Sequence, residues 1–546
     1  MIARLPITQR RQKIQSTIWV VAVCLVLWIL PACRERTPRA TPPRAGRNII
    51  VVLSDTHRLD FVSGFNFSVD APTPNVARLV KDGLSFSRAY TAIPISAPSY
   101  ASILSGLPPG RHGLLNNGQK LSGELSLLPE LLHELGYRTA GIVSNPFCSA
   151  SYGFDRGFDT FWDGVEGIGK EGEIVTSEAI DWLRKNDAEP DRRPFFLFLA
   201  YMDAHVPYIV QGMPPSLRMA VNGKRVRDGV AENSHIVQHW PVQLQPGPNT
   251  IELSFLEDSR PVEATDDWSP LYLKDLRLSG TQQPDQLLGF HREKEGSFQR
   301  MANRARLLVS NSKNCPVEEE LIFRCFRQYR QENIPSFYET GVRSFDRNFG
   351  ALLDVLQDMG LYRETIILFL SDHGEMLGEH GQWGHVGHMW QESLRVPLII
   401  KAPGVREGGV ISRPVSLSQL RDLMIGLADS GKLEIEGKGR TSRVGRLFAA
   451  TFPPEAPQLQ IAVIGERYKV ILPEQGPCRG FDLEGDVHEK TNLCGSGEMA
   501  PELSTLISAG RRMLERLKSS RQLDLNNLSL EERDSLRALG YLDSRQ

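Results

Sequence analysis

Two aspartates of this sequence lie where apolar strands are expected to end. Asp55 follows the apolar run 48–54, and the pair Asp372-His373 follows the run 365–371. Open α/β sheets collect ligands at the carboxyl ends of their strands, so these side chains are expected at one edge of a sheet. Carboxylate oxygens suit a hard cation, and two buried carboxylates would repel each other without one. The two aspartates therefore predict a metal site.

A serine at the start of an expected helix could supply a nucleophile. In the segment Ser96-Ala97-Pro98-Ser99, the proline suits the first position of a helix, where its missing N–H costs nothing. The free amides and the dipole at a helix start favour a bound anion. Ser96 beside a metal would thus form a site able to bind and cleave an anionic ester.

Strands and helices alternate around these residues. Residues 127–135 have a helical pattern and are followed by the β-rich run 137–143, as in the βαβ units of a parallel sheet. The strand 195–199 leads to His205, which adds a third polar strand end. Apolar residues at helical spacing within 342–356 predict a further helix. The pattern predicts an α/β fold.

Four segments give the chain a resemblance to a known family. It resembles the sulfatases of the alkaline-phosphatase superfamily over roughly residues 47–210 and 335–495. The resemblance implies an alkaline-phosphatase-like α/β/α sandwich and a metal-dependent sulfuric ester hydrolase that acts on an aryl or carbohydrate sulfate ester. The segments that carry it are Asp55-Thr56-His57-Arg58-Leu59-Asp60, Ser96-Ala97-Pro98-Ser99-Tyr100, Ser371-Asp372-His373-Gly374-Glu375 and Arg395-Val396-Pro397-Leu398-Ile399-Ile400.

The resemblance assigns roles to the metal site. It implies that Asp55, Ser96, Asp372 and His373 bind one divalent metal. By family this is Ca²⁺, while the nitrogen donor of His373 leaves Mg²⁺, Mn²⁺ and Zn²⁺ open. In the family, the residue at the place of Ser96 is a cysteine or serine that a maturation enzyme converts to formylglycine. Here Tyr100 replaces the arginine of the family motif, so plain serine and formylglycine both remain open.

Three histidines, an arginine and an asparagine complete the predicted site. His205 resembles the family histidine that contacts the bound anion. His385 is the first choice for the acid that protonates the leaving group, and His388 is the next. Arg58, Asn117 and His388 are predicted to bind the substrate, which would be a sulfated small molecule or glycan.

Two lysines that are customary in the family are absent from this chain, one of them from the segment 143–146. Fewer fixed positive charges imply a weaker hold on the anion or a different leaving group. Two other functions therefore stay open. The first is a phosphodiesterase or phosphonate monoester hydrolase in which Ser96 carries the phosphoryl group. The second is a non-catalytic sulfatase-like protein that binds glycan through residues 213–280.

The chain is expected to form several units, since 546 residues suggest about three domains. We predict a catalytic domain over 48–412, a small C-terminal α+β subdomain over 413–500 and a charged helical tail over 501–546. Between residues 213 and 280 the apolar period changes to two, and Asn222-Gly223 is a strong hairpin turn. This region predicts a β-sandwich inserted into the catalytic domain.

Residues 1–33 are predicted to be a leader. A basic start, an apolar stretch and the segment Leu30-Pro31-Ala32-Cys33 resemble a bacterial lipoprotein signal, with an uncleaved membrane anchor as the alternative. Residues 34–47, rich in proline and arginine, are predicted to be an extended linker. Both alternatives imply a membrane-anchored protein of the cell envelope that faces the periplasm or the exterior.

Composition excludes one class of partner. With 63 basic and 65 acidic residues, the net charge is −2. The sequence has no basic stripe of the kind that binds nucleic acid, so nucleic acid is not expected as a partner. An oxidising compartment would allow the local disulfides Cys315–Cys325 and Cys478–Cys494, leaving Cys148 free.

Overall fold

The computed structural model describes most of the chain after the predicted leader. The described residues are 46–65, 71–163, 172–191, 193–205, 216–230, 237–255, 271–278, 304–311, 313, 316–327, 334–405, 407–430, 446–451, 459–495 and 499–518. The predicted leader with Cys33, the linker up to residue 45 and the predicted pairing of Cys315 lie outside these ranges. Within them, no helix is both long and apolar enough to cross a membrane.

An eight-stranded sheet forms the centre of the catalytic domain, in the order β19-β2-β18-β14-β1-β6-β4-β5. β18 runs antiparallel to both of its neighbours, and every other neighbouring pair is parallel. The strands are β1 (Ile49–Ser54), β2 (Leu84–Phe86), β4 (Arg138–Val143), β5 (Thr160–Trp162), β6 (Phe195–Tyr201), β14 (Ile366–Leu370), β18 (Leu398–Lys401) and β19 (Gly409–Ile411).

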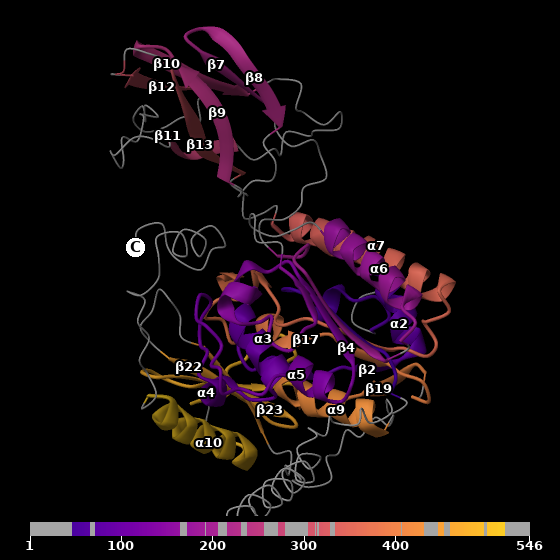
Figure 1. Ribbon diagram of the computed structural model, residues 1–546. Helices are drawn as coiled ribbons and strands as arrows, with labels where there is room; N and C mark the ends of the chain where they lie inside the picture. Colours follow the sequence, from indigo (N-terminus) through magenta and orange to yellow (C-terminus); the bar gives the residue numbers. More distant parts are fainter. Residues whose placement is uncertain are drawn as a thin grey trace, which may run out of the picture. The chain divides into compact units, whose positions relative to one another are not determined.

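Helices cover both faces of this sheet (Figure 1). Along β1, Ile49, Val51 and Leu53 belong to the core on one face, whereas Ile50 and Val52 belong to the core on the other. The first core includes side chains of α3 (Ser96–Ser105), α5 (Leu128–Glu134) and α9 (Leu420–Ser430), and the second those of α2 (Pro74–Asp82), α6 (Gly172–Ala188) and α7 (Ile334–Asp358). A strand buried on both faces explains its continuous apolar run. The predicted α/β/α sandwich is confirmed.

Shorter elements join these layers. One small sheet has the order β17-β3-β20, and β15 pairs with β16 in a hairpin. The bounds are β3 (Ala89–Tyr90), β15 (Met376–Leu377), β16 (Trp383–Gly384), β17 (Arg395–Val396), β20 (Val415–Ser416), α4 (Pro109–His112) and α8 (Gln391–Leu394).

The inserted domain is made of two antiparallel sheets, with orders β12-β10-β7-β8 and β11-β13-β9. Residues of both sheets, such as Met219 and Val242, are buried, as in a sandwich with a shared interior. Asn222 and Gly223 both have positive φ, as a type I′ turn requires. The strands are β7 (Ser216–Val221), β8 (Lys224–Val230), β9 (Val237–Leu244), β10 (Gly247–Phe255), β11 (Leu271–Leu278), β12 (Arg304–Asn311) and β13 (Val317–Arg327).

The insert is longer than the predicted range 213–280. β12 pairs with β10, and β13 pairs with both β9 and β11, so the sheets are completed only at Arg327. The period-two pattern that suggested an end near residue 280 breaks after β11. The pairing partners of the last two strands lie far away in sequence, and local periodicity does not reveal such partners.

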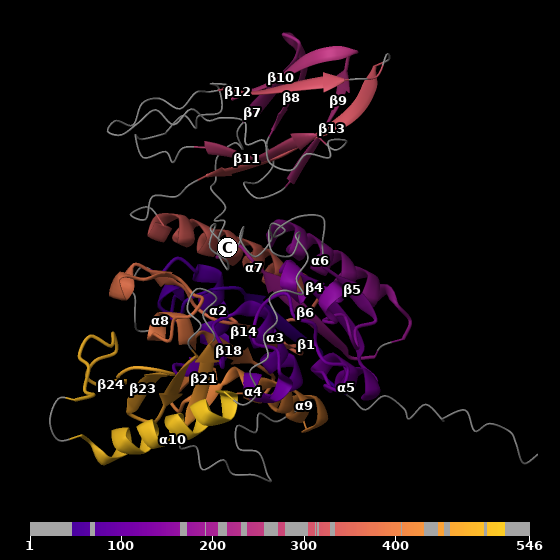
Figure 2. The same ribbon diagram turned by 90° about the vertical axis from the view of Figure 1, so that its left-hand side faces the viewer.

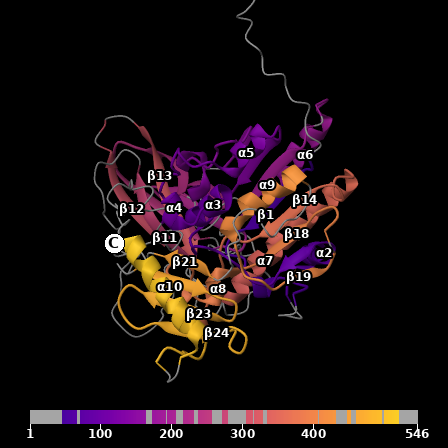
Figure 3. The same ribbon diagram turned by 90° about the horizontal axis from the view of Figure 1, so that it is seen from below.

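The C-terminal subdomain is a four-stranded antiparallel sheet covered by one long helix, α10 (Pro501–Lys518). The helix contributes Leu503, Leu506 and Leu514 to a core shared with the sheet, and Figure 2 and Figure 3 show it beside β23. The strands are β21 (Leu447–Thr451), β22 (Gln460–Ile464), β23 (Tyr468–Pro473) and β24 (Arg479–Asp482). The described part of the predicted tail, up to Lys518, thus completes this subdomain.

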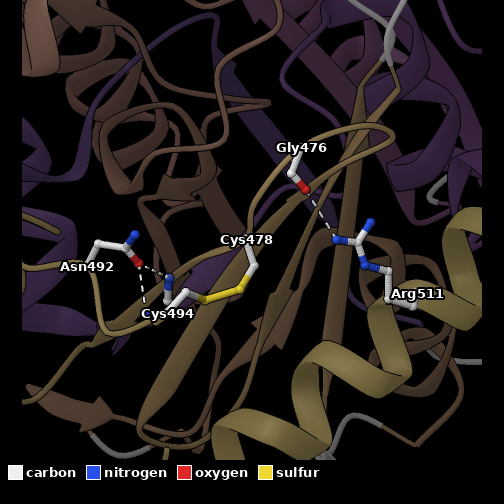
Figure 4. The surroundings of a disulfide bond; sticks show 6 residues. Gly476, Cys478, Asn492, Cys494 and Arg511 are labelled. Atoms are coloured by element: carbon white, nitrogen blue, oxygen red, sulfur yellow. Dashed lines mark hydrogen bonds between the residues drawn. A yellow bond between two sulfur atoms is a disulfide. The ribbon is translucent and has the colours of Figure 1, made fainter. Parts of the chain in front are cut away.

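The start of this subdomain also differs from the prediction. Leu417, Leu420 and Met424 lie in the core above the main sheet, so α9 belongs to the catalytic domain although it follows residue 412. The predicted disulfide Cys478–Cys494 is confirmed (Figure 4), and Cys478 directly precedes β24. Cys148 is free and buried, as predicted.

Candidate active site and metal centre

The carboxyl ends of three neighbouring strands provide the base of the site. β14, β1 and β6 are adjacent in the sheet and run parallel. Asp372 follows β14, Asp55 follows β1, and His205 comes shortly after β6. All three side chains are buried. The sheet therefore gathers polar strand ends that are far apart in the sequence.

Four predicted ligands lie side by side. Asp55, Asp372 and His373 each offer one ligand atom, and these atoms lie within 4.8 Å of one another. His373 Nε2 is 3.8 Å from Asp55 Oδ1 and 3.3 Å from Asp372 Oδ2. The hydroxyl of Ser96 is 3.3 Å from the same nitrogen. Two carboxylates, an imidazole and a hydroxyl thus converge on one point.

Hydrogen bonds orient both carboxylates so that one oxygen of each is left over. Asp372 Oδ1 accepts the backbone N–H groups of Thr56 and His373 at 3.2 and 2.9 Å. Asp55 Oδ2 accepts the side-chain amide of Asn145 at 2.8 Å. Asp55 Oδ1 and Asp372 Oδ2 are buried and have no hydrogen-bond partner among the described residues. Buried acceptors without partners are unfavourable unless a cation or another donor satisfies them.

The imidazole of His373 presents a lone pair to these oxygens. Its Nδ1 lies 3.0 Å from the carbonyl of Gly374, so Nδ1 carries the proton and Nε2 is the acceptor. Burial and the neighbouring His385 lower the pKa of His373 well below its usual value, which keeps the ring neutral. A Cβ on Gly374 would lie 1.9 Å from the carbonyl oxygen of Glu392, so only glycine fits beside this ligand.

The electrostatics of the carboxylate pair fit a divalent cation. Burial and the charge of Asp55 raise the pKa of Asp372 well above its usual value. The repulsion shows that two negative charges here are unfavourable by themselves, and a bound cation would remove it. Oxygen donors with one neutral imidazole, together with the two unpartnered oxygens, therefore suit a divalent metal.

Thr56 adopts an unusual backbone conformation that serves this arrangement. Its φ is 57°, a value rare for a β-branched residue. The hydroxyl of Tyr338 donates to the Thr56 carbonyl at 2.8 Å, and the Thr56 hydroxyl donates to the Ala204 carbonyl at 2.8 Å. These contacts hold the conformation that directs the Thr56 N–H at Asp372. Strain of this kind is typical of functional sites.

Helix α3 places Ser96 at the centre of the site. Ser96 is its first residue and Pro98 its third, not the first as predicted. The third amide of a helix also lacks an intrahelical acceptor, so proline is tolerated there. The Ser99 hydroxyl donates to the Asp372 carbonyl at 2.8 Å and links the helix to β14. Tyr100 is buried in edge-to-face contacts with Phe154 and Phe198, in the core.

Asn117 lies at the start of α3. Its Oδ1 accepts the N–H of Ala97 at 2.9 Å. Its buried Nδ2 has no hydrogen-bond partner among the described residues. The fixed orientation leaves this amide as a donor beside Ser96, as its predicted role in substrate binding requires.

The predicted acid belongs to a cluster of histidines. The ring of His385 lies 4.3 Å from that of His373 and 5.3 Å from that of His205. Its Nδ1 is 2.9 Å from Glu375 Oε2, and both side chains are buried. Burial lowers the pKa of His385 well below its usual value and raises the pKa of Glu375 to about 7, so burial favours the neutral form of both groups. His388 is partly buried and follows in the same loop.

Arg58 is enclosed by protein acceptors. Its guanidinium pairs with Asp60 at 2.7 Å and with Glu379 at 2.7 Å, and donates to the Glu375 carbonyl at 3.2 Å. These contacts bring Arg58 to the loop that runs from Glu375 to Glu379. Its predicted contact with substrate stays a prediction.

Two residues of the site were missed in the sequence. Asn145 follows β4 as Asp55 follows β1, so the rule of polar strand ends could have identified it. Its Oδ1 accepts the N–H of Phe147 at 2.9 Å, which turns its amide nitrogen toward Asp55. Glu375 was part of a quoted motif, but its partner His385 is brought to it only by the β15–β16 hairpin.

Comparisons with known proteins point to one family. The family model described as Sulfatase matches residues 47–430. N-acetylglucosamine-6-O-sulfatase of Bacteroides thetaiotaomicron is 26% identical over 392 residues, which cover 68% of this chain and 65% of that protein. Choline-sulfatase of Rhizobium meliloti is 25% identical over 488 residues, 79% of this chain and 80% of that protein. The chain thus spans less than two thirds of the first of these relatives.

Solved structures share the fold. A protein in complex with its substrate D-glucosamine-2-N,6-O-disulfate has a TM-score of 0.56 at 19% identity, covering 87% of this chain and 98% of its own. The phosphonate monoester hydrolase of Agrobacterium radiobacter has a TM-score of 0.53 at 16% identity, covering 89% and 98%. At these identities the likeness supports the architecture alone.

Proposed function

Because this chain belongs to the sulfatase family, we propose that it is a metal-dependent hydrolase that releases sulfate from an aryl or carbohydrate sulfate ester. The observation that carries the proposal is the pair of unpartnered buried oxygens, Asp55 Oδ1 and Asp372 Oδ2, next to His373 Nε2 and the Ser96 hydroxyl. A divalent cation held by these residues would polarise the ester oxygens and stabilise the charge that develops on them. The oxygen-rich donor set favours Ca²⁺.

The remaining residues have separate tasks in this proposal. A hydroxyl of Ser96, or of the hydrated formylglycine made from it, attacks the sulfur while the bond from sulfur to the leaving oxygen breaks. Water then hydrolyses the sulfate ester of a plain serine, whereas the second hydroxyl of the formylglycine hydrate would expel sulfate and restore the aldehyde. The Asn117 amide and His205 hold the oxygens of the ester. His385 gives a proton to the leaving oxygen, and Glu375 orients its ring through the 2.9 Å contact with Nδ1. Close packing around these groups keeps the imidazole in one orientation, which favours proton transfer along one direction.

Ser96→Ala tests the assignment of the nucleophile. Turnover should fall by about 10³-fold or more, because positioning and electrostatic groups alone give only residual catalysis. Ser105→Ala is the control, since this serine lies on the same helix but donates to the Ala101 carbonyl inside it. Near-normal turnover in Ser96→Ala with an intact fold would refute the mechanism.

The chemical form of Ser96 separates this proposal from its alternatives. Tyr100, in place of the family arginine, favours a second candidate in which plain Ser96 serves a phosphodiester or phosphonate monoester hydrolase. The mass of the peptide containing Ser96 should be measured after co-expression with a formylglycine-maturation enzyme. The turnover of matched aryl sulfate, phosphodiester and phosphonate substrates is then compared. A formylglycine mass with sulfate release supports the first candidate, and plain serine with phosphonate hydrolysis supports the second. No turnover of any of these substrates would support the glycan-binding alternative.

The proposed location is the cell envelope. Cys33 in the predicted leader would carry a lipid that anchors the protein, with the catalytic domain facing the periplasm or the exterior. Cys33→Ala should move the protein from the membrane fraction to the soluble fraction. Unchanged membrane association would favour an uncleaved anchor.

A further inference from the structure

An aromatic stack lies beside the loop that carries His385 and His388. The His380 ring lies parallel to the Trp390 indole, with ring centroids 3.7 Å apart and an interplanar angle of 5°. The guanidinium carbon of Arg479 lies over the same indole, 4.7 Å from its centroid. Trp390 and His380 come from the catalytic domain, whereas Arg479 is on β24 of the C-terminal subdomain. The stack therefore joins the catalytic domain to the C-terminal subdomain beside the loop that carries His385 and His388.

Within the described part of the chain, Arg479 makes no direct contact with an acidic side chain. Among the described residues its side chain has no hydrogen bond and no ion pair, although it is only partly exposed. The carboxylate whose charge raises the pKa of Arg479 is Glu489, and it lies 2.6 Å from Lys469, with which it pairs directly. A guanidinium that stacks through its face keeps its N–H donors free at its edge. Arg479 thus has unused capacity to bind an anion.

The backbone on both sides of Arg479 is held in place by a disulfide and by hydrogen bonds. The preceding residue, Cys478, forms the disulfide with Cys494. The following residue, Gly480, donates its N–H to Asn492 Oδ1 at 2.9 Å, and the Cys494 N–H donates to the same oxygen at 3.0 Å. A side chain held on a rigid strand loses little further entropy when it binds a ligand.

Arg479 also lies close to the predicted catalytic loop. After burial, its charge is among the causes that lower the pKa of His388. Trp390, on which it stacks, follows His388 by two residues. Arg479 therefore lies beside the loop that carries His385 and His388.

We propose that Arg479 forms a second anion subsite, which binds an additional carboxylate or sulfate group carried by the ester substrate. The planar fork of a guanidinium matches both groups in a bidentate geometry. Glu489 pairs directly with Lys469 and not with Arg479, so an anion in direct contact with the partly buried guanidinium would stabilise its charge. The inference rests on the proposed sulfatase function and narrows its substrates to esters with at least two anionic groups.

The test compares probes that differ in one charge. 3-Carboxyphenyl sulfate is paired with 3-carbamoylphenyl sulfate, which has the same shape and the same sulfate ester but no second charge. 3-Sulfophenyl sulfate and 3-sulfamoylphenyl sulfate form a second pair of this kind. Binding is measured by calorimetry in the Ser96→Ala background, where the probes stay intact. In at least one pair, the probe with two charges should bind about tenfold more tightly than the probe with one charge, as one charge-assisted contact predicts. The pair with the larger ratio identifies the second anion as a carboxylate or a sulfate.

Arg479→Gln should bring both ratios close to one, and Arg479→Lys, which keeps the charge but loses the fork, should give intermediate ratios. Arg467→Gln is the matched control, because this arginine of the same subdomain already pairs with Asp482 at 2.6 Å. Ratios near one before any change at Arg479, or ratios that persist in Arg479→Gln, would overturn the proposal. Failure of the sulfatase function itself would show separately, as an absence of sulfate release by the unmodified enzyme.

Discussion

Asp55 and Asp372 each have one oxygen held by the protein and one oxygen left without a partner. The donor to Asp55 is the neutral amide of Asn145, near the place where the family resemblance leads one to expect a lysine. A neutral donor orients the carboxylate without cancelling its charge. The carboxylate pair therefore keeps its full attraction for a cation, and also its full repulsion when no cation is bound.

Asp372→Asn should have opposite effects on the protein with and without metal. The metal-free variant should melt at the same temperature as the parent or above it, because the repulsion from Asp55 is removed. Added Ca²⁺ should no longer raise the melting temperature, and turnover should fall by about 10³-fold, since one charged ligand is lost. Thermal melting with chelator and with Ca²⁺ measures both effects, and Asp354→Asn at the surface is the control. A full Ca²⁺-dependent shift in Asp372→Asn would remove Asp372 from the ligand set.

His385→Ala should slow esters in proportion to how poor their leaving groups are. A good aryl leaving group needs little protonation, whereas an alkyl or sugar oxygen needs a full proton. The steepness of log kcat/KM against leaving-group pKa should therefore increase in the variant. His388→Ala is the comparison, because this histidine is next in the same loop. An equal slowing of all esters by His385→Ala would assign the proton to another group.

A chain of hydrogen bonds joins His112 to helix α3. His112 Nδ1 accepts the N–H of Leu114 at 3.1 Å, so the proton lies on Nε2, which donates to the Ser102 hydroxyl at 2.9 Å. That hydroxyl donates to the Pro98 carbonyl at 3.1 Å. The chain requires a neutral imidazole, and burial lowers the pKa of His112 to about 4. The helix that carries Ser96 thus depends on the protonation state of His112, which lies outside the candidate site.

The free energy of unfolding should decrease as the pH falls from 6.5 toward 4. In this window the unfolded state, with its ordinary histidine pKa of 6.5, binds a proton that the folded state with its pKa of about 4 does not bind. Stability is complete above the window, and the loss is at most about 3 kcal/mol, since each pKa unit is worth about 1.4 kcal/mol. His112→Gln keeps a donor and an acceptor but does not titrate. Denaturant unfolding at several pH values should give a smaller slope for this variant, and equal slopes would exclude His112 as the cause.

A buried ion pair of the C-terminal subdomain is hydrogen-bonded to the catalytic domain. Lys469 on β23 and Glu489 lie 2.6 Å apart and are both inaccessible to solvent. Glu489 has a φ of 53° and accepts the N–H of Gln391 at 2.8 Å. Ser393, in the same short helix as Gln391, accepts the N–H of Gly374 at 2.9 Å. This path runs from the subdomain to the residue beside the ligand His373.

Lys469→Met should destabilise the protein strongly, by about 3–5 kcal/mol, because it leaves the Glu489 carboxylate buried without a counter-charge. The double variant Lys469→Met/Glu489→Gln should recover much of this loss, since the glutamine carbonyl can still accept the Gln391 N–H. Unfolding of the two single variants and the double variant measures the coupling. Additive effects would mean that the two charges do not act as a pair.

Local patterns in the sequence were sufficient for the layers and for the grouping of the candidate metal ligands. Continuous apolar runs predicted β1 and β14, helical spacing predicted α7, and the polar residues after the strands predicted Asp55, Asp372 and His373 as neighbours. These inferences succeed because burial imposes a period on each element and because parallel strands end at one edge. The predicted pairing of Cys478 with Cys494 succeeded because the two residues are close in sequence.

Only the tertiary structure decided which partners these residues have. Asn145 on Asp55, Glu375 on His385 and Arg479 over Trp390 join segments whose separation in the chain carries no period. The end of the insert at Arg327 and the place of α9 in the catalytic core depend on strand order and on packing between layers. Sequence periodicity reports which face of an element is buried, whereas a specific contact depends on the position of every element between the two residues.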